Sequence, residues 1–235
     1  MAPTIRLRPR ATMSKFVVEF GKQTPGETPD GRLDAPAFHR NVEPIWEAIG
    51  GFLAGRTGDL LEIGSGTGQH AATYAARTPQ LIWWPSDIYE SHLASIAAWR
   101  AEAGLPNLRA PQRIDLTVPD WTWAPGGTLS AMLCINVTHI SPWRVSENLL
   151  SGAARFLAPD GRLFVYGPFM RDGQHTAPSN AAFDASLHAQ NAEWGVRDVG
   201  ALAAVAHKVG LSLAETVPMP ANNMMLVFAR AERHN

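Results

Sequence analysis

A glycine-dense turn between an apolar run and a helical stretch is the segment of this chain best suited to chemistry. Residues 60–70 read LLEIGSGTGQH, with glycines at positions 64, 66 and 68. Because glycine has no Cβ, the backbone there can pass close to a ligand. The helix that follows offers unpaired N–H groups and the positive end of its dipole. The segment therefore predicts a nucleotide-binding turn.

The spacing of these glycines argues against a dinucleotide. The fingerprint G-x-G-x-x-G needs a third glycine where the helix packs on the strand, and Gln69 occupies that place. The sequence instead resembles motif I of class I S-adenosylmethionine (SAM) methyltransferases, with Glu62-x-Gly64-x-Gly66-x-Gly68. The resemblance implies that the cofactor-binding residues of this turn are Glu62, Gly64, Ser65, Gly66 and Gly68.

An acidic residue ends the next apolar run, where a ribose would lie. Residues 81–87 read LIWWPSD, which places Asp87 about 20 residues beyond the glycines, as expected for a carboxylate that accepts hydrogen bonds from ribose hydroxyls. Asp87 also precedes a helical stretch, so a helix N-cap is an alternative role that does not exclude ribose binding.

Strands and helices alternate along the rest of the chain. Apolar periodicity predicts strands at 60–63, 81–86, 108–114, 129–135 and 162–166, and helices at 37–54, 69–77, 90–103 and 142–157. Residues 211–217 and 223–229 predict an antiparallel hairpin. The expected fold is α/β: a Rossmann-like class I SAM-methyltransferase fold with a seven-stranded, mostly parallel sheet and an antiparallel C-terminal hairpin.

Composition narrows the class of protein. The 235 residues are 46% hydrophobic, enough for one sizeable core, and the formal net charge of -1 argues against a nucleic-acid binder. No segment resembles a membrane span, and the single cysteine, Cys134, fits a reducing cytoplasm. We expect a cytoplasmic monomer or homodimer without a metal, with a flexible extension at 1–34 and one domain at 35–235. The Arg-rich start leaves an organellar presequence open.

The carboxyl ends of the later strands supply further candidate ligands. An open α/β sheet binds its ligand at this edge, where Asp115, Leu116 and Asn136 fall. Asp115 would accept a hydrogen bond from the adenine amino group, and Ile88 and Leu116 would enclose the ring. Asn136 would face the methionine end of the cofactor. The alternatives are an Asx-turn for Asp115 and satisfaction of strand-end backbone for Asn136.

Three longer stretches carry a more specific resemblance. Residues 134–143 (CINVTHISPW), 166–173 (YGPFMRDG) and 178–184 (PSNAAFD) are similar to a family of methyltransferase-like proteins known only as a SAM-dependent methyltransferase domain of unknown function, with bacterial members and an animal member. The likeness extends from residue 35 to residue 230, although in that family alanine often replaces the glycine at position 64. It implies the fold and the cofactor but no substrate.

The chemistry of methyl transfer indicates which residues could bind the methyl acceptor and remove its proton. Methyl transfer needs an aligned nucleophile and, for oxygen or protonated nitrogen, removal of a proton. His139 is the candidate base because it follows the fourth strand and an unperturbed imidazole pKa of about 6.5 suits the task; satisfaction of turn backbone is its alternative. Tyr166 is the second catalytic candidate. The candidate acceptor-binding residues, from the first helix and from the polar stretch after the fifth strand, are Arg40, Asn41, Trp143, Arg171, His175, Asn180 and Asp184.

These candidates have ordinary alternatives too. Asn180 suits a helix N-cap, Arg171 a solvated surface arginine and Trp143 a packing residue. We expect a SAM-dependent methyltransferase that methylates oxygen or sulfur of a small-molecule acceptor beneath a lid and releases S-adenosylhomocysteine (SAH). The alternative is a SAM-binding protein without transfer activity that acts through partners. Nucleic-acid methylation is disfavoured because no Asn-Pro-Pro-aromatic signature follows the fourth strand.

Overall fold

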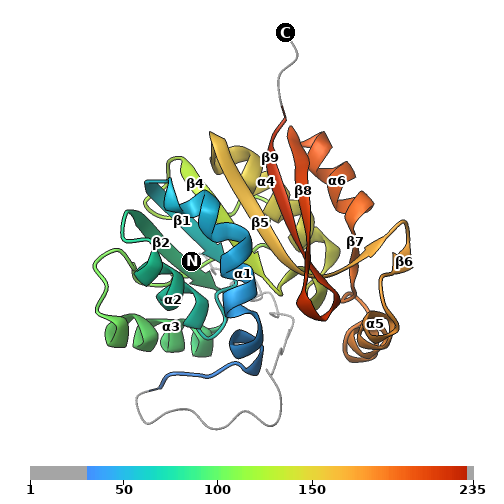
Figure 1. Ribbon diagram of the computed structural model, residues 1–235, viewed down its shortest axis with the longest axis horizontal. Coiled ribbons are helices and arrows are strands. Elements are labelled where there is room, and N and C mark those ends of the chain that lie inside the picture. The colour runs from blue at the N-terminus through green and yellow to red at the C-terminus, as the bar shows by residue number, and fades with distance from the viewer. Residues whose placement is uncertain (1–30, 232–235) are drawn as a thin grey trace, which may run out of the picture.

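A computed structural model describes residues 31–231 of the chain, which form one sheet with helices on both faces (Figure 1). The strands are β1 Gly58–Ile63, β2 Leu81–Asp87, β3 Gln112–Arg113, β4 Leu129–Ile135, β5 Leu157–Arg171, β6 Gln174–His175, β7 Arg197–Asp198, β8 Leu211–Met219 and β9 Asn223–Arg230. The helices are α1 Pro36–Ala54, α2 Gln69–Arg77, α3 Glu90–Ala103, α4 Trp143–Phe156, α5 Pro178–Gln190 and α6 Val199–Lys208, with short 3₁₀ helices η1 Thr138–Ile140 and η2 Pro220–Asn222.

The order of the strands confirms the predicted fold class. The main path of the 9-stranded sheet runs β3-β2-β1-β4-β5-β9-β8, and β6 and β7 pair with β5. The pairs from β3 to β5 are parallel, whereas β9 lies antiparallel to both β5 and β8. The main path therefore has the predicted seven strands and the predicted C-terminal hairpin.

Three elements differ from the prediction. The strand expected at 108–114 is only the two-residue β3 and an isolated bridge at Leu108, because Pro111 has no N–H to continue the ladder. In contrast, β5 is longer than expected and continues past Gly167 to Arg171. Helix α6 was not predicted.

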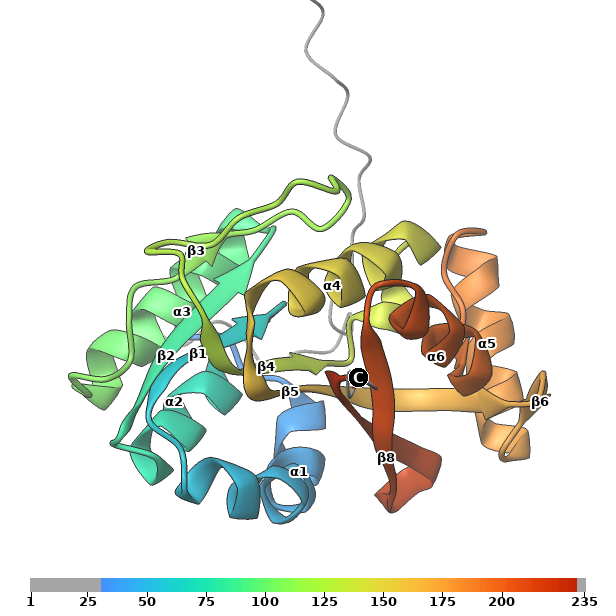
Figure 2. The ribbon, with the colours of Figure 1, turned by 90° about the horizontal axis from the view of Figure 1, so that it is seen from above.

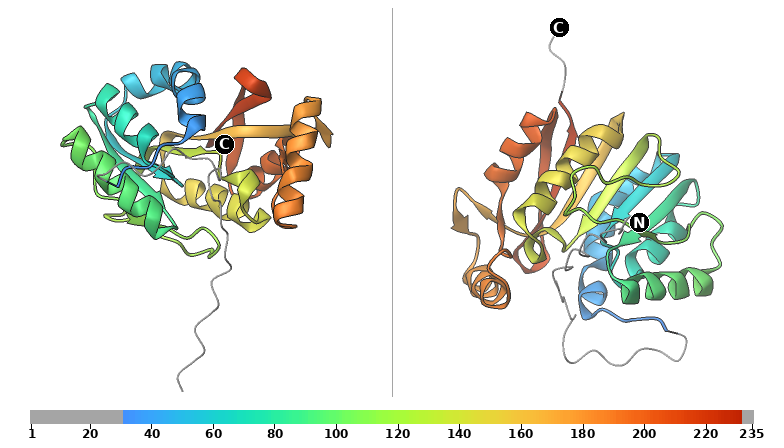
Figure 3. Two further views of the ribbon diagram at one scale, coloured as in Figure 1. Left: turned by 90° about the horizontal axis from the view of Figure 1, so that it is seen from below. Right: turned by 180° about the vertical axis from the view of Figure 1, so that it is seen from behind.

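The sheet is buried on both faces by two sets of helices. Figure 2 shows α1 and α2 on one side of the sheet and α4 on the other, and Figure 3 shows α5 standing beyond the end of β5. Leu60 packs with α1 and α2, and its neighbour Leu61 packs with α4, as the alternation of a strand requires. The open edge of the strands is therefore the part of the sheet left for a ligand.

Gln69, which replaces the third glycine of a dinucleotide turn, holds the first described residues. Its side-chain oxygen accepts from Ala35 N at 2.8 Å and its amide nitrogen donates to Asp34 Oδ1 at 2.7 Å. Leu33 N also donates to Ser95 Oγ on α3 at 2.9 Å. The extension predicted at 1–34 lies, up to residue 30, outside the described residues, and the division into extension and domain stays a prediction.

Candidate functional site

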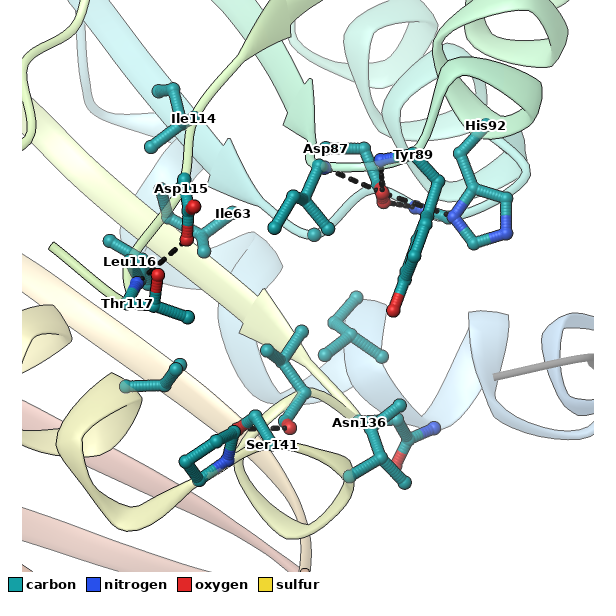
Figure 4. A pocket seen from close by; sticks show the side chains of 18 residues that line it. Ile63, Asp87, Tyr89, His92, Ile114, Asp115, Leu116, Thr117, Asn136 and Ser141 are labelled. Carbon is teal, nitrogen blue, oxygen red and sulfur yellow. Dashed lines mark hydrogen bonds and ion pairs between the residues drawn. The ribbon is translucent and has the colours of Figure 1, made fainter. Parts of the chain in front are cut away.

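A pocket opens at the carboxyl edge of the sheet, where β1, β2 and β4 end (Figure 4). It holds about 750 Å³ of empty space, including its open mouth. The strand order reverses between β1 and β4, and this switch point is where open α/β sheets bind their ligands. Seven residues predicted to bind the cofactor line the pocket: Gly64, Gly66, Asp87, Ile88, Asp115, Leu116 and Asn136.

The glycine turn needs its glycines for two physical reasons. Its three glycines have φ of +65°, +56° and +92°, a left-handed backbone that other residues rarely adopt. A Cβ on Gly64 would also lie 2.5 Å from Val137 Cγ2, and one on Gly68 would lie 2.8 Å from Ile96 Cα. The turn therefore lets α2 approach α3 and leaves the pocket floor open.

Gly68→Ala should destabilise the fold strongly. The φ of +92° strains an alanine, and the atom that its Cβ would meet belongs to the backbone of α3 and cannot rotate away. We expect the free energy of unfolding to fall by about 2–5 kcal/mol in urea denaturation. The control is Gly51→Ala, an α1 glycine with open space around its Cα, which should be neutral or stabilising by up to about 1 kcal/mol. Equal stability of the two variants would contradict this account.

Asp87 is held rigidly at the end of β2. Its Oδ1 accepts from Ile88 N at 2.8 Å and Tyr89 N at 3.0 Å and contacts His92 Nδ1 at 3.1 Å. Its Oδ2 accepts from Gly66 N at 2.9 Å. The alternative of a helix N-cap is wrong, since the N-cap of α3 is Tyr89. The carboxylate instead joins β2 to the glycine turn.

A second carboxylate, Asp115, faces the pocket from the far side. Figure 4 shows Asp87, Asp115 and Asn136 approaching the cavity from three directions. Asp115 Oδ1 accepts from Thr117 N at 2.8 Å, which is the predicted Asx-turn, while the residue still lines the pocket. The wall between the carboxylates is mostly apolar and includes Ile88. The pocket thus combines two acids with an apolar slot.

Glu62 lies on the α1 and α2 side of β1, two residues before the glycine turn. It is 1% exposed, and its Oε2 has no hydrogen-bond partner among the described residues. Burial raises the pKa of Glu62 to about 7; a hydrogen bond from Ser65 opposes this shift and the charge of Asp87 adds to it. Glu62, Ser65 and Gly68 do not line the pocket. One oxygen of this buried carboxyl group, Oε2, is therefore left beside the turn without a partner among the described residues and suits a cationic ligand group.

His139 lies in η1, next to the pocket but outside its lining. It is 5% exposed, and burial together with the charge of Arg197 lowers its pKa to about 3, so the imidazole is neutral. Its Nδ1 has no partner among the described residues. A Cβ on Gly167 would lie 3.2 Å from this Nδ1 and 3.7 Å from Asn136 Oδ1. His139 Nδ1 and the pocket residue Asn136 therefore face the same point above Gly167.

Tyr166, in β5, contacts Asn41 of α1 and Asn223, the first residue of β9. Burial raises the pKa of its hydroxyl, while hydrogen bonds from Asn41 and Asn223 and the charge of Arg40 oppose the shift. Asn41 Oδ1 also pairs with His70 Nε2 at 2.9 Å. The structure thus brings Arg40 and Asn41 to Tyr166, which lies far from both of them in the sequence.

Some of the other predicted acceptor-binding residues make polar contacts with other protein groups, and the rest pack against the core or lie exposed. Asn180 donates to Asn222 O at 2.9 Å and is not an N-cap, because Ala177 holds that position in α5. Asp184 lies 3.3 Å from His175 Nε2 in an ion-pair geometry. Trp143 packs against the core, and Arg171 is exposed at the end of β5. These five residues do not line the pocket.

Several residues that line the pocket were not predicted from the sequence. They are chiefly Tyr89, His92, Thr117, Ile140 and Ser141. Each follows a predicted strand-end ligand by two to five residues, so its position just past a strand end is the signal in the sequence that marks it. Within residues 31–231, no group of three or more His, Cys, Asp or Glu side chains is arranged to hold a metal ion. Among the helices that the structure describes, none is long and apolar enough to cross a membrane.

Three solved structures with a similar fold are methyltransferases by name. An O-methyltransferase family protein from Burkholderia thailandensis matches with a TM-score of 0.71 and 17% identity, over 84% of this chain and 58% of the other. The mitomycin 7-O-methyltransferase MmcR matches at 0.66 and 19%, over 82% and 54%. CalO1, a methyltransferase in calicheamicin biosynthesis in its SAH-bound form, matches at 0.60 and 18%, over 82% and 55%. The chain spans under two thirds of their lengths, and this likeness establishes the fold.

A family pattern covers most of the chain. Residues 32–230 match the family described as "Protein of unknown function (DUF938)". The match includes every strand, the glycine turn and all the pocket residues. The chain belongs to this family.

Proposed function

We propose that this protein is a SAM-dependent methyltransferase that methylates oxygen or sulfur of a small-molecule acceptor. The observation that carries the proposal is the pocket at the switch point, with Asp87 fixed to the glycine turn and Asp115 across an apolar slot. The similar structures are named as methyltransferases, and one holds SAH, which supports the same reading.

The residues at this site fit the parts of SAM. Asp87 has lone pairs left to accept ribose hydroxyls, and Asp115 offers an acceptor to the adenine amino group. Ile88 and Leu116 would enclose the ring. Glu62 lies behind the glycine turn and outside the pocket lining, and its Oε2, which has no partner among the described residues, would face the α-ammonium group. Bound SAM supplies an electrophilic methyl group on a sulfonium.

His139 is the proposed general base. Its neutral imidazole offers an unpartnered Nδ1 at the Asn136 end of the pocket, where it can accept the acceptor's proton. A base with a pKa of about 3 binds a proton weakly, so it suits acidic acceptors such as thiols and phenols better than alcohols. Tyr166, Arg40 and Asn41 would contact the acceptor body, beneath α5 as a lid.

Radiolabelled methyl transfer from SAM to a panel of small thiols and phenols tests this proposal. His139→Gln should lower turnover by about 100-fold or more, the size of a general-base contribution, with unchanged SAH affinity. Gly167→Ala should also lower turnover, because its Cβ would fill the space beside His139 Nδ1. His188→Gln, an exposed histidine of α5, is the control.

Two outcomes would contradict parts of the proposal. Full turnover by His139→Gln at every pH would remove His139 as the base. SAM binding without transfer to any thiol or phenol would favour the alternative of a SAM-binding protein that acts through partners.

A further inference from the structure

Arg197, at the start of β7, donates hydrogen bonds to backbone carbonyls of the segment that carries His139. Its Nε donates to Thr138 O at 2.9 Å, and its Nη2 donates to Ser141 O and, at 3.0 Å, to Glu193 O. These three carbonyls accept hydrogen bonds from one guanidinium, whose planar set of five donors suits several acceptors at once. Arg197 therefore bonds to the first residue of η1 and to Ser141, the residue that follows it.

The backbone next to Arg197 also forms hydrogen bonds that hold η1 in place. Gly195 N donates to His139 O at 3.0 Å, so the middle of η1 is bonded from the same loop. Val196 N in turn donates to Asp184 Oδ1 on α5 at 2.6 Å. The loop thus ties η1 to α5, whose Phe183 ring lies edge-on to the His139 imidazole at 5.5 Å between centroids.

The segment 137–141, which Arg197 holds, both lines the pocket and carries His139. Val137, Ile140 and Ser141 line the pocket, and His139 lies between them. A single 3₁₀ turn of three residues has poor internal hydrogen bonds and cannot hold its own conformation. The segment therefore depends on contacts from outside, and Arg197 supplies most of those to its carbonyls.

We infer that Arg197 is a positioning residue that fixes residues 137–141, and with them His139 and one wall of the pocket. The role of Arg197 in catalysis rests on the proposed function, whereas its hydrogen bonds to the pocket wall do not. Lysine cannot replace this arginine fully, because an ammonium is a compact charge and cannot reach the separated carbonyls together.

The test compares two variants. Arg197→Met removes both the positive charge and the planar set of guanidinium N–H donors, whereas Arg197→Lys keeps the charge and removes only that set of donors. Arg144→Met is the control, since Arg144 lies in the same region but makes one exposed ion pair, with Glu193. SAH affinity is measured by calorimetry. The pKa of His139 is followed by NMR on ¹⁵N-histidine-labelled protein, with the signal assigned by its absence in His139→Gln.

Both Arg197 variants should bind SAH at least tenfold more weakly than the wild type, and Arg144→Met should not. Only Arg197→Met should raise the pKa of His139, because burial and the charge of Arg197 together lower that pKa and the variant removes the charge; Asp184 on α5 acts on Arg197 itself. The lysine variant keeps the charge and so keeps the low pKa.

A purely structural role for Arg197 would lower the melting temperature and leave the SAH affinity and the His139 signal unchanged, which would overturn the inference. If Arg197→Met does not fold, unchanged SAH affinity in Arg197→Lys would overturn it equally. If the wild type itself does not bind SAH, the proposed function fails. The His139 signal of the free protein would then still decide whether Arg197 sets its surroundings.

Discussion

Asp87→Asn should weaken SAM binding by about 100-fold or more while the protein stays folded. Hydrogen bonds to a charged group contribute about 1.5–3 kcal/mol each, and about 1.4 kcal/mol is a tenfold change in affinity, so losing two of them reaches that size. The amide has the shape of the carboxylate, but its NH₂ group would face either Gly66 N or His92 Nδ1, both now bonded to Asp87. Calorimetric titration with SAM measures the loss.

Asp59→Asn is the matched control for this experiment. Asp59 lies near the opposite end of β1 and accepts from Trp84 Nε1 at 2.6 Å, outside the pocket. The same chemical change there should leave the SAM affinity unchanged. A folded Asp87→Asn protein with wild-type affinity would show that Asp87 does not bind the ribose.

Glu62→Gln should stabilise the protein at pH 8 and weaken its binding of SAM. The pKa of Glu62 is raised from 4.5 to about 7 in the folded state. The folded state therefore binds a proton that the unfolded state releases, and this stabilisation, complete below pH 4.5, is lost as pH rises through 7. At pH 8 the wild type buries a charge that glutamine does not carry, so the variant should gain about 3 kcal/mol.

The pH dependence separates this effect from ordinary repacking. At pH 5 the Glu62 carboxyl is already protonated, and the variant should be nearly as stable as the wild type in urea denaturation. Glu43→Gln serves as the control, since the exposed Glu43 pairs with Arg77, which lowers its pKa, and is ionised at both pH values. The SAM affinity of Glu62→Gln should fall about tenfold at pH 8, the loss of one charge-assisted hydrogen bond. An equal stability change at pH 5 and pH 8 would contradict the pKa argument.

The sheet and the strand-end residues that line the pocket were predictable because they depend on local order along the chain. An apolar run predicts a buried parallel strand, and its carboxyl end must lie at the ligand edge, so Asp87, Asp115 and Asn136 could be placed from the sequence. The errors in the predicted strands arose at proline and glycine residues, which can either end a strand or lie within one. Pro111 ended a strand, whereas Gly167 and Pro168 continued one that pairs with β9.

The contacts around His139 and Tyr166 could not be predicted because they join distant segments of the chain. Tyr166 meets Asn41 and Asn223, and His139 is held by Arg197, which no motif marks. The burial of His139 also depends on α5 and on the loop before β7, and it moves the imidazole pKa far from the value assumed for a free side chain. Spacing in the sequence carries none of this information.

Calorimetric titration of the wild-type protein with SAM and with SAH tests the central claim most directly. The account predicts one site per chain with micromolar affinity for both ligands, since their nucleoside and amino-acid parts are the same. It also predicts that SAM affinity rises with pH through about 7, as the Glu62 carboxyl ionises. No binding of either ligand to a well-folded sample would contradict the claim that the pocket beside Asp87 is a SAM site.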